Sequence, residues 1–418
     1  MPDYAGIKQR TFTHSLVCWI AILLGLIAII LSRKPHILEF AHYYLGAKYH
    51  NEVNYTGLYN ALSAAIVEIH GEDEFISVVP VVRDLKSGKY IKSRFAIEHH
   101  AENPNWIPKR WEEFKNDVFF IQTMLGTYSE KPPILHWRKI LVDHGYNAPP
   151  TYTAYVSIIT NAIPLGFISV YLLGAFDAVL ILLTFLIIRR IFGFDGAVIA
   201  FIFFASALDM LSYVTWALFR FDWFFAIAVA LWFLSKRKYF LSGIMWGISS
   251  SLRIFPAVIA AFFVVVFALS RRAERKRISG IGGFLSGGFI GATVFSVMST
   301  IIVYISTNIS PMQIWAKFIQ RISIHGQTFN ILNAVGLDRL IEVIGIKTYG
   351  ITEVIISILL VVILIWTIIR KSLKPEVIAT LSILFTPLVL YISHYLSLIH
   401  ISEPTRPLYI SYAVFCLK

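Results

Sequence analysis

Apolar residues run along most of this chain in uninterrupted stretches of roughly 20 positions, the length that a helix needs to cross a lipid bilayer. The core of a soluble protein cannot bury so many apolar residues. The pattern predicts membrane spans at about residues 13–31, 166–188, 193–210, 221–235, 239–254, 256–270, 279–306, 351–369 and 376–395. The sequence therefore predicts an all-α polytopic membrane protein with about nine transmembrane helices.

One long segment, residues 32–150, interrupts this pattern. It holds 14 Lys and Arg against 14 Asp and Glu, with Trp, Tyr and His throughout, so we expect a folded unit of helices and loops on the membrane face. No small-residue cleavage site follows the first span, which predicts a retained signal anchor. We expect a signal-anchor helix at 1–31, a loop domain at 32–165 and a transmembrane bundle at 166–395.

Basic residues cluster in every second loop, and this sets the orientation. Thirteen Lys and Arg lie at 189–190, 236–238, 271–277 and 370–374. Cytoplasmic loops carry such an excess. We therefore expect a multi-pass protein of the plasma (inner) membrane, with the N-terminus in the cytoplasm and the large loop outside. The net charge of +12 is explained by these loops, and we expect no nucleic-acid partner.

The final segment, residues 396–418, resembles translated sequencing-adapter sequence, beginning with LSLIHISEPTR. We expect it to be an artefactual tail and base no fold prediction on it. The natural chain is then expected to continue beyond Tyr395 with further helices. The two cysteines, Cys18 and Cys416, predict neither a disulfide framework nor thiol chemistry.

Polar chemistry is concentrated just after the first span, at Ile37–Tyr59. This stretch carries Glu39, His42, Lys48 and several tyrosines. The short spans around Pro256 predict a hairpin, since proline ends a helix, with Arg253 at its tip. Loops on the same outer side add further polar groups, which are Trp216, Arg220, Asp222, Lys317, Arg321, His325, Asn330 and Asn333.

Each of these residues also has a simpler explanation. Glu39 could pair with Arg33 or Lys34, and Arg253 could extend to lipid headgroups. Acids within spans are functional candidates by default, and Asp177, Asp195 and Asp209 are of this kind. No His, Cys and Asp cluster has metal-ligand spacing, so we expect no metal and no cofactor. The glycines between Gly282 and Gly291 predict close helix packing.

Several segments together resemble the GT-C glycosyltransferases, most closely glycosyltransferase family 87, whose members use polyprenyl-phosphate mannose. The resemblance spans residues 39–340. It is carried, in chain order, by Glu39-Phe40, Tyr43-Tyr44, Gly57-Leu58-Tyr59, Tyr146-Asn147-Ala148-Pro149-Pro150, Ile163-Pro164-Leu165, Gly243 and Gly247 before Arg253-Ile254-Phe255-Pro256, and Asn333-Ala334-Val335-Gly336-Leu337.

This resemblance implies a hexosyltransferase that moves a mannose-like sugar from a polyprenyl-phosphate donor to a glycan or lipid acceptor, among membrane lipids. Inverting transfer needs a carboxylate base, which is Glu39, with His42 as the second catalytic candidate. Cations stabilise the leaving phosphate, and Arg253 and His325 fit this role. The implied substrate-binding residues are Tyr43, Lys48, Tyr146, Asn147, Arg220, Asp222 and Asn330.

The chain departs from the family pattern in three places. Position 39 is glutamate where the family usually has aspartate, so the base assignment could move to His42 or Asp84. The first outer loop is longer than usual. Arg220-Phe221-Asp222 stands where Gly-Gln-x-Asn is common.

Two other functions are compatible with the residues alone. A transporter or flippase for a lipid-linked intermediate would also use Arg253 and a membrane cavity, although no internal repeat supports it. A non-catalytic scaffold would use the large loop for interactions. A cavity that converges on Glu39 and Arg253 favours the enzyme.

Overall fold

The computed structural model describes residues 35–103, 105–127, 132–206, 216–270, 274–327, 334–335, 358–360, 362–363, 365–366, 373–383 and 392–393. The expected span at 13–31 and the segment 396–418 lie outside these residues, and those at 193–210, 351–369 and 376–395 are described only in part.

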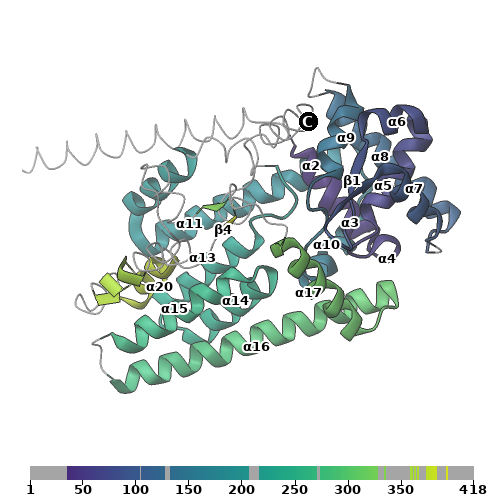
Figure 1. The fold of residues 1–418 in the computed structure, drawn as a ribbon. Helices are drawn as coiled ribbons and strands as arrows, with labels where there is room; N and C mark the ends of the chain where they lie inside the picture. Colours follow the sequence, from purple (N-terminus) through teal and green to yellow (C-terminus); the bar gives the residue numbers. More distant parts are fainter. Residues whose placement is uncertain are drawn as a thin grey trace, which may run out of the picture.

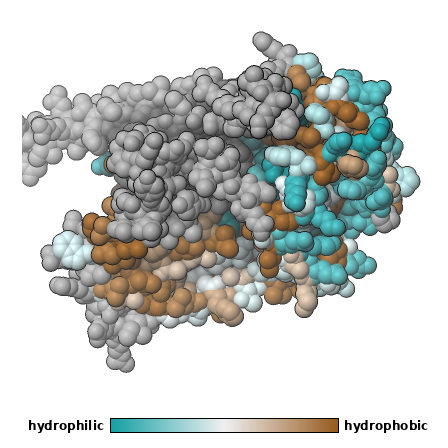
Figure 2. All heavy atoms as spheres, in the orientation of Figure 1, coloured by the Kyte–Doolittle hydropathy of each residue, from teal (hydrophilic) through white to brown (hydrophobic). Residues whose placement is uncertain are grey.

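The described chain is mostly helical, as predicted (Figure 1), and divides into a polar and an apolar part (Figure 2). The first part, which we call the polar unit, covers residues 35–162. Its elements are α2 (Ile37–Glu39), the π-helical turn η1 (Phe40–Tyr44), α3 (Leu45–Lys48), α4 (His50–Val53), α5 (Leu58–His70), α6 (Glu72–Val78), β1 (Val81–Arg83), β2 (Tyr90–Lys92), α7 (Ser93–Ala101), α8 (Pro108–Thr127), α9 (Pro133–Leu141) and α10 (Pro150–Ala162).

The core of the polar unit forms because its helices are amphipathic. On α8, Phe114, Val118, Ile121 and Leu125 recur at the three- and four-residue spacing that places side chains on one helix face, and all are buried. They pack into one cluster with residues of η1, α5 and α9. The segment predicted to be a folded unit of helices and loops therefore has a core of its own.

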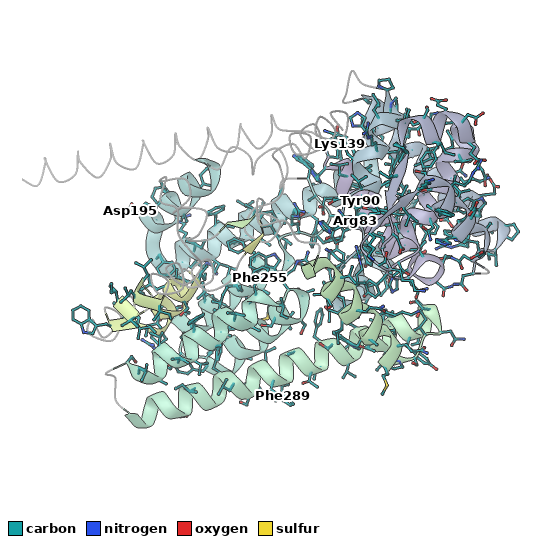
Figure 3. The ribbon with its side chains drawn as sticks, in the orientation of Figure 1. Arg83, Tyr90, Lys139, Asp195, Phe255 and Phe289 are labelled. Atoms are coloured by element: carbon teal, nitrogen blue, oxygen red, sulfur yellow. The ribbon has the colours of Figure 1, made fainter. Side chains whose placement is uncertain are left out.

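A short antiparallel hairpin adds strands that the sequence did not predict. Strands β1 and β2 pair with Val82 opposite Ile91. The Asp84 carboxylate accepts the backbone N–H groups of Lys86 and Ser87 and so closes the turn. The guanidinium of Arg83 donates to the hydroxyl of Tyr90 at 2.7 Å (Figure 3).

The second part, which we call the apolar bundle, consists of α11 (Phe167–Ser206), α13 (Asp222–Ser235), α14 (Tyr239–Leu252), α15 (Phe255–Leu269), α16 (Glu274–Thr307) and α20 (Pro375–Ile383). Gly193 has φ 80° and ψ −178°, so α11 is two helical pieces that meet at this residue. The sequence predicted two spans here, the second beginning at residue 193. Nearby strands β3 (Ala334–Val335) and β4 (Ile392–Ser393) form a second antiparallel pair.

Two described helices, Phe167–Phe201 and Ser279–Thr307, are long and apolar enough to cross a membrane. Large side chains on their surfaces face outward, and Phe289 on the outer side of α16 is 73% exposed (Figure 3). Hydrophobic atoms gather over the bundle, whereas the polar unit has a largely hydrophilic surface (Figure 2). Such an exposed apolar surface is compatible with membrane association.

Glycines set the spacing between α14 and α16. A Cβ at Gly243 or Gly247 would lie within 2.2 Å of a backbone oxygen of α16, and one at Gly287 or Gly291 within 2.3 Å of a backbone oxygen of α14. The two backbones are therefore in direct contact, as small-residue helix interfaces allow. The helix packing predicted for the glycine series is confirmed at Gly287 and Gly291, and a Cβ at Gly282 would meet nothing within 4 Å.

The helix α17 (Pro311–Gln327) lies inside a segment that the sequence predicted as a loop. Its side chains at Ile314, Phe318 and Arg321 share one face, and Arg321 is buried beneath the polar unit. The Arg321 guanidinium donates to the carbonyl of Leu85 at 2.9 Å and to the carbonyl of His144. These contacts fasten α17 to two loops of the polar unit.

Candidate active site

The carboxylate of Glu39 lies at the junction between the polar unit and the apolar bundle. It accepts a hydrogen bond from Nη2 of Arg220 at 2.5 Å, and both side chains are largely buried. This ion pair joins the first turn of the polar unit to the segment before α13, 181 positions along the chain. The simpler pairing of Glu39 with Arg33 or Lys34 involves residues outside the described part.

The segment that carries Arg220 is held against α11. Gly174 permits the approach, because a Cβ there would lie 2.9 Å from the Cα of Trp216. The Asp177 carboxylate accepts the backbone N–H groups of Arg220 at 3.0 Å and Phe221 at 3.1 Å. Asp177 is fully buried, so this acid within an apolar helix positions the arginine.

Tyr43 is a buried residue of η1, the π-helical turn that begins directly after Glu39. Its hydroxyl donates to Oδ1 of Asn147 at 2.7 Å. Burial raises the pKa of Tyr43 to about 12, and the negative charge of Glu39 adds to this effect, whereas the charges of Arg253 and Arg220 oppose it. The charges of Glu39, Arg220 and Arg253 therefore all act on the pKa of this hydroxyl.

Arg253 occupies the extended turn between α14 and α15, as the sequence predicted. Its guanidinium carbon lies 5.5 Å from the ring centroid of Tyr152 on α10. One turn later on the same helix, the hydroxyl of Tyr155 donates to the carboxylate of Asp222. We call Glu39, Tyr43, Asn147, Tyr152, Arg220, Asp222 and Arg253 the junction cluster.

His42 points into the polar unit. Its Nε2 lies 3.0 Å from the hydroxyl of Tyr59, and its Nδ1 lies 3.9 Å from Oδ2 of Asp143. The ring is buried, with 5% of its surface exposed. These contacts hold the His42 ring in place and so stabilise the π-helical turn. Such irregular turns are frequent at functional sites.

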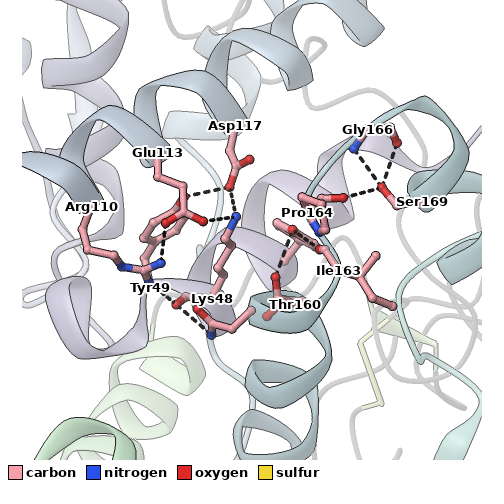
Figure 4. A network of polar contacts seen from close by, with 12 residues as sticks. Lys48, Tyr49, Arg110, Glu113, Asp117, Thr160, Ile163, Pro164, Gly166 and Ser169 are labelled. Atoms are coloured by element: carbon pink, nitrogen blue, oxygen red, sulfur yellow. Dashed lines mark hydrogen bonds and ion pairs between the residues drawn. The ribbon is translucent and has the colours of Figure 1, made fainter.

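Lys48 is not part of the junction cluster. Its ammonium group lies 2.7 Å from Oδ2 of Asp117 and 2.8 Å from Oε1 of Glu113, both on α8 (Figure 4). The hydroxyl of Tyr49 also donates to Asp117. Because the ammonium is buried and already bound by two carboxylates, the structure gives Lys48 a structural role in place of the expected substrate contact.

Three further expected site residues are either buried or outside the described part of the chain. Tyr146 is fully buried, and its hydroxyl lies 2.6 Å from Oγ1 of Thr153. Its ring packs edge-on against the ring of Tyr43 and helps to position it. The backbone of His325 belongs to α17, but its side chain lies outside the described part, as does Asn330. Asp84, the alternative base, closes the β1–β2 turn.

Tyr152 and Tyr155 were not predicted as site residues, although the sequence carries a signal for them. Both follow Pro149-Pro150 at a three-residue spacing, which places them on one face of the helix that starts there. For Asp177 the sequence predicted no more than a functional candidate within a span. Among the described residues, no group of three or more His, Cys, Asp or Glu side chains could hold a metal ion.

A row of rings extends from Tyr43 through Tyr146 and Tyr55 to His50, with neighbouring centroids 4.9–5.8 Å apart. Burial lowers the pKa of His50 to about 4, and the positive charge of Lys317 acts in the same direction. The neutral imidazole is therefore the form that fits the folded state.

This shift predicts a pH-dependent stability. An unfolded histidine titrates near pH 6.5, so in the window from about 6.5 to about 4 the unfolded state binds more protons, and stability falls as the pH falls. In His50→Phe, which keeps an aromatic ring, we expect the thermal unfolding midpoint to fall less over this window. Superimposable pH curves for the two proteins would contradict the assignment.

Comparisons with protein-family models, curated proteins and solved structures find no match to this chain.

Proposed function

We propose that this chain is a membrane glycosyltransferase that moves a mannose-like sugar from a polyprenyl-phosphate donor to a glycan or lipid acceptor. The observation that carries the proposal is the junction cluster, where the Glu39 carboxylate pairs with Arg220 and the Arg253 guanidinium lies over the ring of Tyr152, which contacts Tyr43. The cluster lies where a hydrophilic unit meets an apolar bundle, and a substrate with a lipid tail and a polar head needs both surroundings. The resemblance to family 87 adds to this argument.

In the proposed reaction, the Glu39 carboxylate accepts the proton of the acceptor hydroxyl as the new glycosidic bond forms. The sugar–phosphate bond breaks, and its electrons remain on the phosphate oxygen. Arg253 and Arg220 stabilise this charge. Nη1 of Arg220 has no hydrogen-bond partner among the described residues, so it can bind phosphate while Nη2 holds Glu39.

The other parts of the cluster position these groups. Asp177 holds the backbone of Arg220, and Asp222 holds Tyr155 next to the proposed phosphate site. The proposal places the polar unit outside the plasma (inner) membrane, the N-terminus in the cytoplasm and about nine helices across the bilayer. The lipid tail of the donor would then lie against the exposed apolar helices.

Replacing Glu39 with glutamine should lower transfer about a hundredfold, because the amide cannot accept the proton. Arg253→Gln should also reduce transfer, with partial recovery in Arg253→Lys. The assay measures transfer of labelled mannose from polyprenyl-phosphate mannose in membranes that contain the full chain. Transfer below detection in wild-type membranes, or full activity in both Glu39→Gln and Arg253→Gln, would refute the proposal.

The matched control for Glu39→Gln is Glu98→Gln. Glu98 is exposed on α7 and, among the described residues, forms no ion pair. Glu98→Gln makes the same chemical change on a helix that carries no residue of the junction cluster, so it should leave transfer unchanged. Because Glu39→Gln also weakens a buried ion pair, its thermal unfolding midpoint should be measured beside its activity. Lost transfer with retained folding separates catalysis from stability.

A further inference from the structure

A cavity of about 340 Å³ lies between α17 and the polar unit, apart from the junction cluster. One wall is the α4–α5 connection with Asn54, a second is the β1–β2 turn with Lys86, and a third is α17 with Lys317 and Gln320. Its volume falls within the range of about 300–1,000 Å³ that is typical of small-molecule sites.

The lining of this cavity is positively charged. Lys86 and Lys317 have no carboxylate within ion-pair distance among the described residues. The acidic side chain in the lining is Glu52, whose Oε1 is held by Nε of Arg110 at 2.8 Å. Burial lowers the pKa of Lys317, as expected for an ammonium group without a counter-charge.

The lining also presents hydrogen-bonding groups. The side chains of Glu52 and Arg321 are only 4% and 1% exposed. In the described part of the chain, Oε2 of Glu52 and Nε of Arg321 have no hydrogen-bond partner. Buried polar atoms normally have a partner, so an unmatched acceptor and donor beside one cavity point to a ligand. Asn54 accepts a hydrogen bond from Lys317 at 3.2 Å, and Gln320 adds a second amide.

We propose that this cavity binds an acidic sugar, a hydroxylated ring that carries a carboxylate or a phosphate. The negative charge lies near Lys86 and Lys317, and the ring hydroxyls bind the amides of Asn54 and Gln320. Oε2 of Glu52 and Nε of Arg321 are closed off from solvent, so they reach the ligand after a shift of their side chains. Carbohydrate binding at this cavity does not depend on the transfer reaction. Its use as a subsite for an acidic residue of the acceptor rests on the proposed function.

The ring row connects this cavity to the junction cluster. Tyr55 lines the cavity and stacks on Tyr146 at 5.8 Å, and Tyr146 contacts Tyr43 at 5.8 Å. The cavity is therefore separated from Tyr43 by a wall of buried rings. Binding energy from such a remote part of a substrate can orient the reacting part.

The test is isothermal titration calorimetry of the full chain in detergent, without donor. D-Glucuronate is the probe, methyl β-D-glucoside is its uncharged match, and inorganic phosphate is the competitor. We expect glucuronate to bind at least about tenfold more tightly than the glucoside, which corresponds to one charge-assisted contact. Displacement of glucuronate by phosphate would extend the ligand class to sugar phosphates, and no displacement would restrict it to carboxylates.

Two variants locate the site. Lys317→Gln should weaken glucuronate binding at least about tenfold, and Lys86→Gln should weaken it in the same direction. Lys89→Gln is the control, because Lys89 is exposed on the same turn but does not line the cavity. Equal binding of glucuronate and glucoside, no measurable binding, or unchanged binding in both variants would overturn the inference. These titrations involve no transfer, so their failure is distinguishable from failure of the proposed function.

Discussion

Replacing Lys48 with methionine is expected to destabilise the polar unit by about 3–5 kcal/mol, the range found when one partner of a buried ion pair is removed. The physical reason is the Asp117 carboxylate, which is 7% exposed and would lose the ammonium that lies 2.7 Å away. Burial already raises the pKa of Asp117 in the presence of Lys48. The measurement is the thermal unfolding midpoint of the full chain in detergent.

The pH dependence gives this prediction a specific signature. Without Lys48, the folded-state pKa of Asp117 rises further above its unfolded value, so the folded state binds more protons and the variant loses stability as the pH rises. The loss of stability in Lys48→Met relative to wild type should therefore be largest at neutral pH and become smaller toward pH 4. Asp117→Asn in the Lys48→Met background should recover part of the loss.

Lys115→Met is the matched control for this prediction. Lys115 also lies on α8 and pairs with Glu68 and Glu112 at 2.7 Å, but its partners are about half exposed or more. Such surface pairs contribute about 0–1 kcal/mol. A loss in Lys48→Met no larger than that in Lys115→Met would show that the buried network is not a major source of stability.

Replacing Gly287 with alanine is expected to cost about 3 kcal/mol, the upper part of the range for overpacking. The added Cβ would lie 2.0 Å from the carbonyl oxygen of Phe240, which is backbone and cannot rotate away. The helices α14 and α16 would have to separate along an interface that Gly243, Gly247 and Gly291 also keep close. The thermal unfolding midpoint of the full chain in detergent measures the effect.

Gly282→Ala makes the same chemical change in the same helix. Its Cβ would meet nothing within 4 Å, and alanine favours a helix over glycine by about 1 kcal/mol. This variant should be as stable as wild type or more stable. Equal midpoints for the two variants would mean that the close backbone approach of α14 and α16 does not limit stability.

Local patterns predicted several elements of this molecule. The run that begins at residue 166 is α11, whose first residue is Phe167, and the turn predicted at Arg253 separates α14 from α15. Both predictions rest on length, charge and proline, which act within a few residues. The glycine spacing predicted a close helix interface for the same reason.

Contacts between distant segments could not be predicted in this way. The pairing of Glu39 with Arg220 depends on how α11 carries the chain back to the polar unit, and no local pattern encodes that path. The burial of Lys48 follows from the position of α8. The helix α17 was missed because its polar residues indicated a loop, although Pro311 at its start and the spacing of Ile314, Phe318 and Arg321 are typical of an amphipathic helix.

The contacts of Arg321 have a consequence for the order in which the protein is built. Leu85 and Arg321 are 236 positions apart. At about 5–20 residues per second, the ribosome needs about 10–50 s to add the chain between them. During that time the polar unit has already been synthesised, but the carbonyls of Leu85 and His144 still lack the hydrogen bonds that Arg321 will donate. The nascent N-terminal unit is thus completed only by a helix that is translated after α11 to α16 of the bundle.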